Sequence, residues 1–268
     1  MTILARSLAL ICILAAPLQA HEFWIEAEAY AVPSGGTVVA TFRNGEELSG
    51  SALSYIPGRS RRLDYIADGP EAPIPARVGD NPAIRLEGLA DGLVTLLHET
   101  TPQTVTYREW DRWVRFTDHK DFAWAQAAHL ERGLPREDFR ESYLRFAKAL
   151  VAVGEGLGAD AWRGMRVEIV AEANPYVDDM SGGLPVQVLY EGEPKADAQI
   201  EMFARDSAGR VAVTLHRADS EGRAVLPVEP GTAYLLDSVS ILPLNPEDEG
   251  GWSWLTLWAA LTFAVPAG

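Results

Sequence analysis

A histidine directly after a predicted signal-peptidase site is the first residue whose type and position indicate chemistry. His21 follows "PLQA", so cleavage after Ala20 would make it the first residue of the mature chain. A terminal histidine presents its α-amine and its imidazole together, and both groups give up a proton near neutrality when a metal ion competes. Imidazole suits nickel, copper, zinc and iron. His21 is therefore a candidate metal ligand, unless it merely follows the end of the signal.

Three further histidines are candidate co-ligands for such a metal, namely His98, His119 and His129. His98 ends a predicted strand, and the other two flank a predicted helix. Ten residues of continuous helix would separate His119 from His129 by about 15 Å along the axis. At most one of them then joins a given site, unless His119 lies on the loop before the helix and folds back. For each of the three, an ordinary core or surface position is the alternative. His216 is predicted to face solvent and is left out of the site.

Composition narrows the chemistry to nitrogen and oxygen ligands. The only cysteine, Cys12, lies in the predicted signal, which excludes disulfides, thiolate catalysis and sulfur-based metal sites from the mature chain. A formal net charge of −15 disfavours nucleic acid and anionic membranes as partners. It favours a cationic ligand, and solubility alone is the alternative explanation. The chain has no phosphate-binding glycine loop, no G-x-S-x-G and no H-E-x-x-H motif. A binding protein is therefore favoured over an enzyme.

The predicted signal peptide occupies residues 1–20, with Arg6 before an apolar stretch that is too short to span a membrane. We therefore expect an exported, periplasmic protein. The apolar tail at 252–265 is also too short for a span. Its residues alternate between two sides, which indicates a final core strand and no transmembrane segment in the mature chain.

The remaining chain divides into three predicted regions. Residues 21–116 alternate as short strands, for example in "TVVATFRNGE" and "GLVTLLHETT", and predict an N-terminal β-sandwich. Residues 117–160 predict a helical segment, with one helix over 117–133 that ends at Gly133. A second helix is predicted over 135–154 from an apolar stripe spaced at four, three and four, formed by Phe139, Tyr143, Phe146 and Leu150. Residues 161–268 return to short strands with Gly-containing turns, which predicts a second antiparallel sandwich.

Two stretches carry a resemblance to a known family. The opening "HEFWIE" resembles the H-[DE]-F-W-[LI]-E start of the DUF4198 family of exported bacterial proteins. The stretch "YLRFAKALVAVG" is similar to that family's central motif Y-x-[RK]-[YF]-[AS]-K-A-L. "ANPY", "DSEGRA" and "LWAALTF" also fit, so the resemblance covers nearly the whole mature chain.

The resemblance implies a fold and a role. Family members are built from immunoglobulin-like β domains, which completes the fold prediction: mostly β, with two immunoglobulin-like antiparallel β-sandwich domains and a two-helix insertion between them. They are often grouped with periplasmic components of cobalt and nickel uptake. His21 matches the opening histidine, and Lys148 matches the central lysine, for which only a helix surface or an ion pair is expected. Ser240 stands about where many members carry a further histidine.

Three functions follow as hypotheses. The first is a periplasmic protein that binds nickel or cobalt (copper and zinc being alternatives) through His21 and passes the ion to a membrane importer. The second is a copper-dependent oxidative enzyme, which needs another histidine beside His21. The third is a carbohydrate-binding or adhesion module, which would expose a row of tryptophans drawn from Trp110, Trp113, Trp252 and Trp254.

Overall fold

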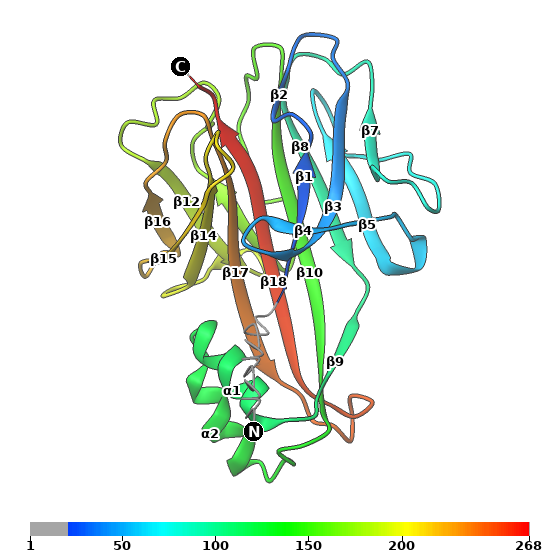
Figure 1. Cartoon of the computed structure of the whole chain (residues 1–268), viewed down its shortest axis with the longest axis vertical. Coiled ribbons are helices and arrows are strands. Elements are labelled where there is room, and N and C mark those ends of the chain that lie inside the picture. Colours follow the sequence, from blue (N-terminus) through cyan, green and yellow to red (C-terminus); the bar gives the residue numbers. More distant parts are fainter. Residues whose placement is uncertain (1–20, 268) are drawn as a thin grey trace, which may run out of the picture.

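The computed structural model describes residues 21–267, so the predicted signal peptide lies outside the described residues. Within that range the chain is mostly β, as predicted, and its strands form three sheets (Figure 1). A short 3-10 turn, η1, covers Pro57–Arg59. The N-terminal sheet contains β1 (Glu22–Ala27), β3 (Val38–Glu46), β4 (Ser49–Leu53) and β7 (Ile84–Leu86). The C-terminal sheet contains β11 (Val167–Ala171), β12 (Leu184–Tyr190), β13 (Glu193–Pro194) and β16 (Arg223–Leu226).

A central sheet of ten strands contains strands from the N-terminal part and from the C-terminal part of the chain. Strands from both predicted sandwich regions, 21–116 and 161–268, enter this one sheet. Its order is β15 (Val211–Arg217), β14 (Gln199–Arg205), β17 (Thr232–Pro243), β18 (Trp252–Val265), β10 (Phe139–Val153), β8 (Gly92–Thr100), β5 (Ser60–Ile66) and β6 (Ala72–Pro73), while β2 (Ala31–Val32) and β9 (Gln103–Tyr107) also pair with β10. The long strands β10 and β18 run parallel at its centre.

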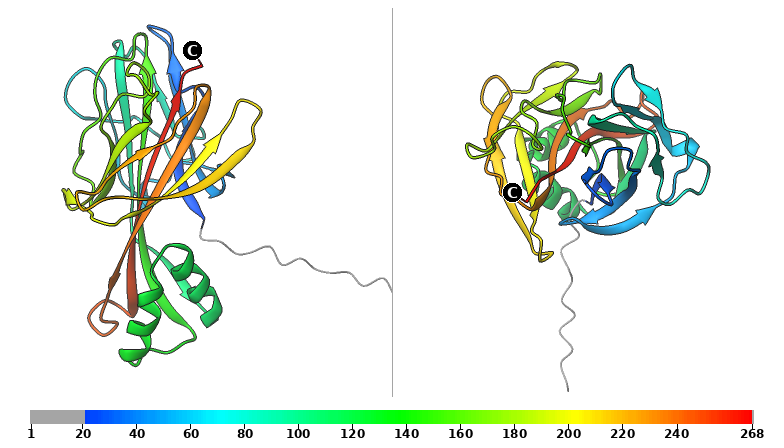
Figure 2. Two further views of the ribbon diagram at one scale, coloured as in Figure 1. Left: turned by 90° about the vertical axis from the view of Figure 1, so that its left-hand side faces the viewer. Right: turned by 90° about the horizontal axis from the view of Figure 1, so that it is seen from above.

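Each smaller sheet covers one face of the central sheet (Figure 2). Successive side chains of a strand point to opposite faces. Leu144 and Phe146 of β10 belong to the core that includes the C-terminal sheet. Ala147 and Ala149 of the same strand belong to the core of the N-terminal sheet. Strand β10 is therefore buried on both sides.

The helical part of the chain begins earlier and is shorter than predicted. Helix α1 covers Trp110–His119 and helix α2 covers Ala123–Glu131, so the single helix predicted over 117–133 is broken. The break lies at Asp121, whose φ of 64° leaves the helical region. Gly133 follows α2 in the left-handed conformation, with φ 67°, as expected of a residue that ends a helix.

The second predicted helix, over 135–154, is wrong, and with it the helical segment 117–160. That stretch forms β10, the longest strand of the central sheet. The apolar stripe at spacing four, three and four belongs to two faces, because Phe139 packs beside the helices while Phe146 and Leu150 pack in the opposite core. A strand buried on both faces reads as a nearly continuous apolar run, which contains helical spacings by chance.

The two helices pack on one end of the central sheet through aromatic side chains. Trp113 and Phe116 of α1 contact Trp254 and Trp258 of β18, with ring centroids 5.4 and 5.8 Å apart. Trp258 shares a side of β18 with Ala260, which lies in the core of the N-terminal sheet. The helices and the N-terminal sheet therefore occupy the same face and leave a cleft between them. Within residues 21–267, neither helix is long and apolar enough to cross a membrane.

Candidate functional site

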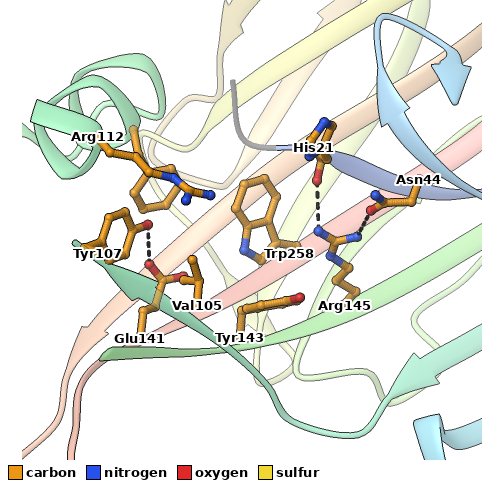
Figure 3. Close-up of a pocket in the computed structure, with 10 residues that line it drawn as sticks. His21, Asn44, Val105, Tyr107, Arg112, Glu141, Tyr143, Arg145 and Trp258 are labelled. Carbon is orange, nitrogen blue, oxygen red and sulfur yellow. Dashed lines mark hydrogen bonds between the residues drawn. The ribbon is translucent and has the colours of Figure 1, made fainter. Parts of the chain in front are cut away.

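The cleft between the helices and the N-terminal sheet holds two adjoining pockets, of about 190 and 320 Å³. Both are lined by Asn44, Tyr143 and Arg145, so strand β10 forms their common floor. His21 lies at the rim of the smaller pocket, and Arg112 reaches into it from helix α1 (Figure 3). Cavities at the junction of structural units are common ligand sites. The cleft is the candidate site.

His21 is held at the rim by strand pairing. Strand β1 pairs with β3 so that Glu22 lies opposite Gly45, which places His21 next to Glu46. The Nε2 atom of His21 is 3.7 Å from the Glu46 carboxylate, and its side chain is 51 % exposed. Its carbonyl accepts a hydrogen bond of 2.9 Å from Arg145. The backbone at His21 is therefore anchored while the imidazole faces solvent.

His98 is buried in the wall of the larger pocket. Its ring packs against those of Phe42 and Phe23, with centroids 4.2 and 5.4 Å apart, and its Nε2 lies 2.9 Å from the Ser60 hydroxyl. Burial lowers its pKa to about 3. His98 is therefore a neutral ring stacked among aromatics. Its Nδ1 has no hydrogen-bond partner among residues 21–267.

His119 and His129 have partners of their own at two different places. His119 ends α1 with Nε2 3.1 Å from the carboxylate of Glu201. His129 is fully buried, and its Nδ1 accepts a hydrogen bond of 3.0 Å from the Trp254 indole. Its Nε2 then donates to the carbonyl of Pro135 at 2.8 Å. Burial lowers the pKa of His129, so the ring is a neutral link in the aromatic cluster.

The structure thus leaves His21 as the histidine available at the rim. Across residues 21–267, no three His, Cys, Asp or Glu side chains are grouped to hold a metal ion. The contacts of His98, His119 and His129 give no support to the prediction that they are co-ligands. The metal itself stays a prediction.

A buried cluster of charges lies beside the cleft. Lys120 contacts the carboxylates of Glu201, Asp237 and Glu22 at 2.6, 2.8 and 3.6 Å. Burial raises the pKa of Glu22 to about 8, and the positive charge of Lys120 only partly opposes this. Burial also acts to raise the pKa of Glu201, but the hydrogen bond from His119 and the charge of Lys120 outweigh it and lower that pKa to about 2. Lys120 therefore neutralises Glu201, while Glu22 retains its proton at neutral pH.

Arg145 and Glu141 form the polar floor of the cleft, and sequence reasoning missed both roles. The guanidinium of Arg145 donates to Asn44 and to the His21 carbonyl. Glu141 accepts hydrogen bonds from the hydroxyls of Tyr107, at 2.8 Å, and Thr256. Burial raises the pKa of Glu141 to about 7. A signal was present in the parity alone, because in a strand Glu141 and Arg145 share one side of 139–153 while Lys148 lies on the other.

Lys148 lies on the opposite face of β10 from the cleft. Its ammonium is buried between Asp160 and Glu168, each at 2.8 Å. The ion pair expected for this lysine is confirmed, and the helix surface is wrong. Glu168 belongs to β11, so the pair ties the central sheet to the C-terminal sheet.

Comparison with known proteins agrees with the motifs quoted from the sequence. A family model described as "Domain of unknown function (DUF4198)" matches residues 18–241. The chain belongs to the DUF4198 family. No curated protein matches this DUF4198 chain. A solved structure described as a tetra-tandem repeat in the extending region of a large adhesion protein is similar at 12 % identity and a TM-score of 0.22, covering 91 % of this chain and 49 % of that one. The chain thus spans about half of that structure, and a likeness this weak carries no argument.

Proposed function

We propose that this DUF4198 protein is exported to the periplasm and there binds one divalent transition-metal ion, nickel or cobalt, as an accessory to uptake. The observation that carries the proposal is the position of His21, anchored through its backbone and open through its imidazole at the rim of the cleft. An importer in the membrane is the proposed recipient of the ion. For the fold, we propose that the N-terminal and the C-terminal β regions are each an immunoglobulin-like sandwich.

The neighbour of His21 favours one mode of metal binding. Glu46 faces the Nε2 atom of the ring. A metal-ligating histidine commonly donates its other ring N–H to a carboxylate, which fixes the tautomer and leaves the first nitrogen free to bind. Glu46 on Nε2 thus leaves Nδ1 for the metal. If cleavage follows Ala20, the α-amine of His21 joins Nδ1 in a chelate.

The two alternative functions receive less support. A copper-dependent oxidative enzyme would need a second imidazole beside His21, and His119 and His129 have their side chains engaged with Glu201 and Trp254. A carbohydrate platform would need exposed rings in a row. Trp113 and Trp254 are fully buried. We therefore favour metal binding without catalysis.

Calorimetric titration of the exported, processed protein with Ni²⁺ and Co²⁺ tests the proposal. N-terminal sequencing first establishes that the chain begins at His21. We expect one ion per chain, loss of binding in His21→Ala, and an affinity about 10–100-fold lower in Glu46→Gln, the range typical of outer-shell partners. One alanine added before His21 removes the chelating amine and should also abolish binding.

His216→Ala is the matched control. His216 is another partly accessible histidine, and it lies with its neighbour Thr214 on β15, whereas His21 directly precedes β1. It should bind as the unmodified protein does. Equal affinity in His21→Ala and His216→Ala would refute the proposed site. Absence of binding by correctly processed protein would refute metal binding altogether.

A further inference from the structure

Arg145 has hydrogen-bonding capacity that the protein does not use. A guanidinium carries five N–H donors. One donates to Asn44 and one to the carbonyl of His21, which leaves three. One of the three is on Nε, which is buried from solvent and has no partner among residues 21–267, so two donors on the Nη atoms remain for a ligand. No carboxylate within the described chain lies within 4.0 Å of this guanidinium, whereas Arg43 and Arg205 each have one and Arg62 has three.

The surroundings of Arg145 are aromatic. Its guanidinium carbon lies 5.1 Å from the ring centroid of Tyr143, 5.7 Å from that of Phe23 and 6.0 Å from that of Trp258. Burial lowers its pKa, since these walls solvate the charge less well than water does. A charged group in such a place is normally paired. Asp237, Glu22 and Glu141 act on this charge only from beyond 4.0 Å, so the guanidinium has no carboxylate in direct contact among residues 21–267.

A second cation faces the same pocket from the other side. Arg112 of α1 lines the smaller pocket and makes no ion pair with any residue of 21–267. Figure 3 shows Arg112 and Arg145 approaching from opposite sides, with the Trp258 ring between them in this view. Glu141, the one carboxylate lining this pocket, already accepts from Tyr107 and Thr256. Among the described residues, the lining of the smaller pocket thus holds two guanidinium groups and one carboxylate, in a chain whose formal net charge is −15.

We propose that the cleft is a binding site for a small aromatic monocarboxylate, whose carboxylate is held by Arg145, whose ring lies against Trp258 and Tyr143, and whose charge is also favoured by Arg112 on the other side of the pocket. Guanidinium groups bind planar carboxylates through two parallel N–H donors, which suits the donors left on Arg145. Tyr107 and Phe116 complete the apolar lining of the smaller pocket. A single negative charge fits, because the two guanidinium groups and the Glu141 carboxylate together leave one net positive charge on the lining once Glu141 is ionised.

This site goes beyond the proposed metal function and does not depend on it. Its determinants are two arginines and aromatic rings, whereas the metal proposal depends on the imidazole and amine of His21. Each site can therefore fail by itself. Measurements in the presence of EDTA separate them, since a carboxylate bound through a metal would be lost there and one bound through Arg145 would remain.

Calorimetry with benzoate as the probe, with EDTA present, tests the inference. Benzamide is the matched neutral ligand, since it keeps the shape and loses the charge. We expect saturable binding of one benzoate per chain and at least about tenfold weaker binding of benzamide, as a charge-assisted contact implies. Inorganic phosphate should not displace benzoate at comparable concentration, because it lacks the ring.

Variants locate the site. Arg112→Gln should weaken benzoate binding about tenfold, and Arg115→Gln, an exposed arginine of the same helix that does not line either pocket, should leave it unchanged. Arg145→Lys keeps the positive charge but loses the paired N–H donors of the guanidinium group, and should weaken benzoate binding more than Arg112→Gln. Arg112 is exposed, so the Arg112→Gln result stands even if Arg145→Lys fails to fold. His21→Ala should still bind benzoate.

Three results would overturn the inference. If benzamide bound with the same affinity as benzoate, the carboxylate charge would make no contribution to binding and no arginine would contact it. Equal effects of Arg112→Gln and Arg115→Gln would show that the anion is attracted by general charge and not by the cleft. Absence of benzoate binding by folded protein would exclude the site.

Discussion

Replacing Glu22 with glutamine should change how the stability of the protein depends on pH. Glu22 is 3 % exposed, and burial raises its pKa from 4.5 to about 8. In the unfolded chain the carboxyl loses its proton near 4.5, while the native chain keeps it. The native state therefore binds more protons between these two values, so stability falls as pH rises through this window and is constant below it.

The size of the effect follows from the two pKa values. Each unit of difference is worth about 1.36 kcal/mol, so the interval from 4.5 to about 8 corresponds to a loss of about 5 kcal/mol above that range. Between about pH 5 and about pH 8.5 the unmodified protein should lose about 4 kcal/mol through Glu22. Glutamine is neutral at every pH, so Glu22→Gln removes this loss and leaves Lys120 paired with Glu201 and Asp237.

Urea unfolding of both proteins at the two pH values measures the difference. We expect Glu22→Gln to be the more stable protein at the higher pH by several kcal/mol and to lose much less stability between the two conditions. Glu28→Gln, on the exposed loop that follows β1, is the matched control and should behave as the unmodified protein. Parallel losses in Glu22→Gln and the unmodified protein would refute the reasoning, because Glu22 would then be ionised in the native state.

Two other buried groups give predictions of stability. Lys148→Met leaves the carboxylates of Asp160 and Glu168 buried without their cation and should lower the free energy of unfolding by about 3–5 kcal/mol in urea titrations; a loss below about 1 kcal/mol would mean that the pair is not desolvated. His129→Phe removes the acceptor of the Trp254 indole, and should cost about 1–3 kcal/mol in thermal unfolding while metal binding is unchanged. If His129→Phe abolished metal binding in a folded protein, His129 would be a ligand after all.

Strands β3 and β8 and the final strand β18 were predictable from the sequence, and β10 was not. β3 and β8 were predicted from alternating or apolar runs with turn residues beside them, and both are present. β10 contains Ala, Leu, Lys and Arg, which favour helices in isolation. The environment decides otherwise, because β10 pairs with β18 along most of its length and is covered on both faces. Tertiary pairing of this kind is invisible in a local window.

Of the residues that line the candidate site, only His21 and His98 were predicted as site residues from the sequence. His21 was found because its place in the sequence marks it, whereas the floor of the cleft depends on strand parity within β10. A helix over 135–154 would have placed Arg145 and Lys148 on adjacent positions of one face, three residues apart. In the strand they point to opposite faces, and one enters the cleft while the other is buried with Asp160. Because this strand was predicted as a helix, the place of Arg145 in the cleft was not predicted.

The geometry at the start of β1 allows the two proposed sites to operate at once. Alternation along the strand sends the His21 imidazole to the rim and the Glu22 carboxyl to the Lys120 cluster. Arg145 uses one Nη donor to hold the His21 carbonyl and one for Asn44, and the two other Nη donors remain for the proposed anion. An anion bound there need not displace the contact that anchors His21. Because that contact joins the two sites, any effect of a bound carboxylate on metal affinity must appear equally as an effect of metal on carboxylate affinity. Titrating the metal with and without carboxylate, and the carboxylate with and without metal, should therefore give the same coupling energy. Arg145→Lys should abolish this coupling.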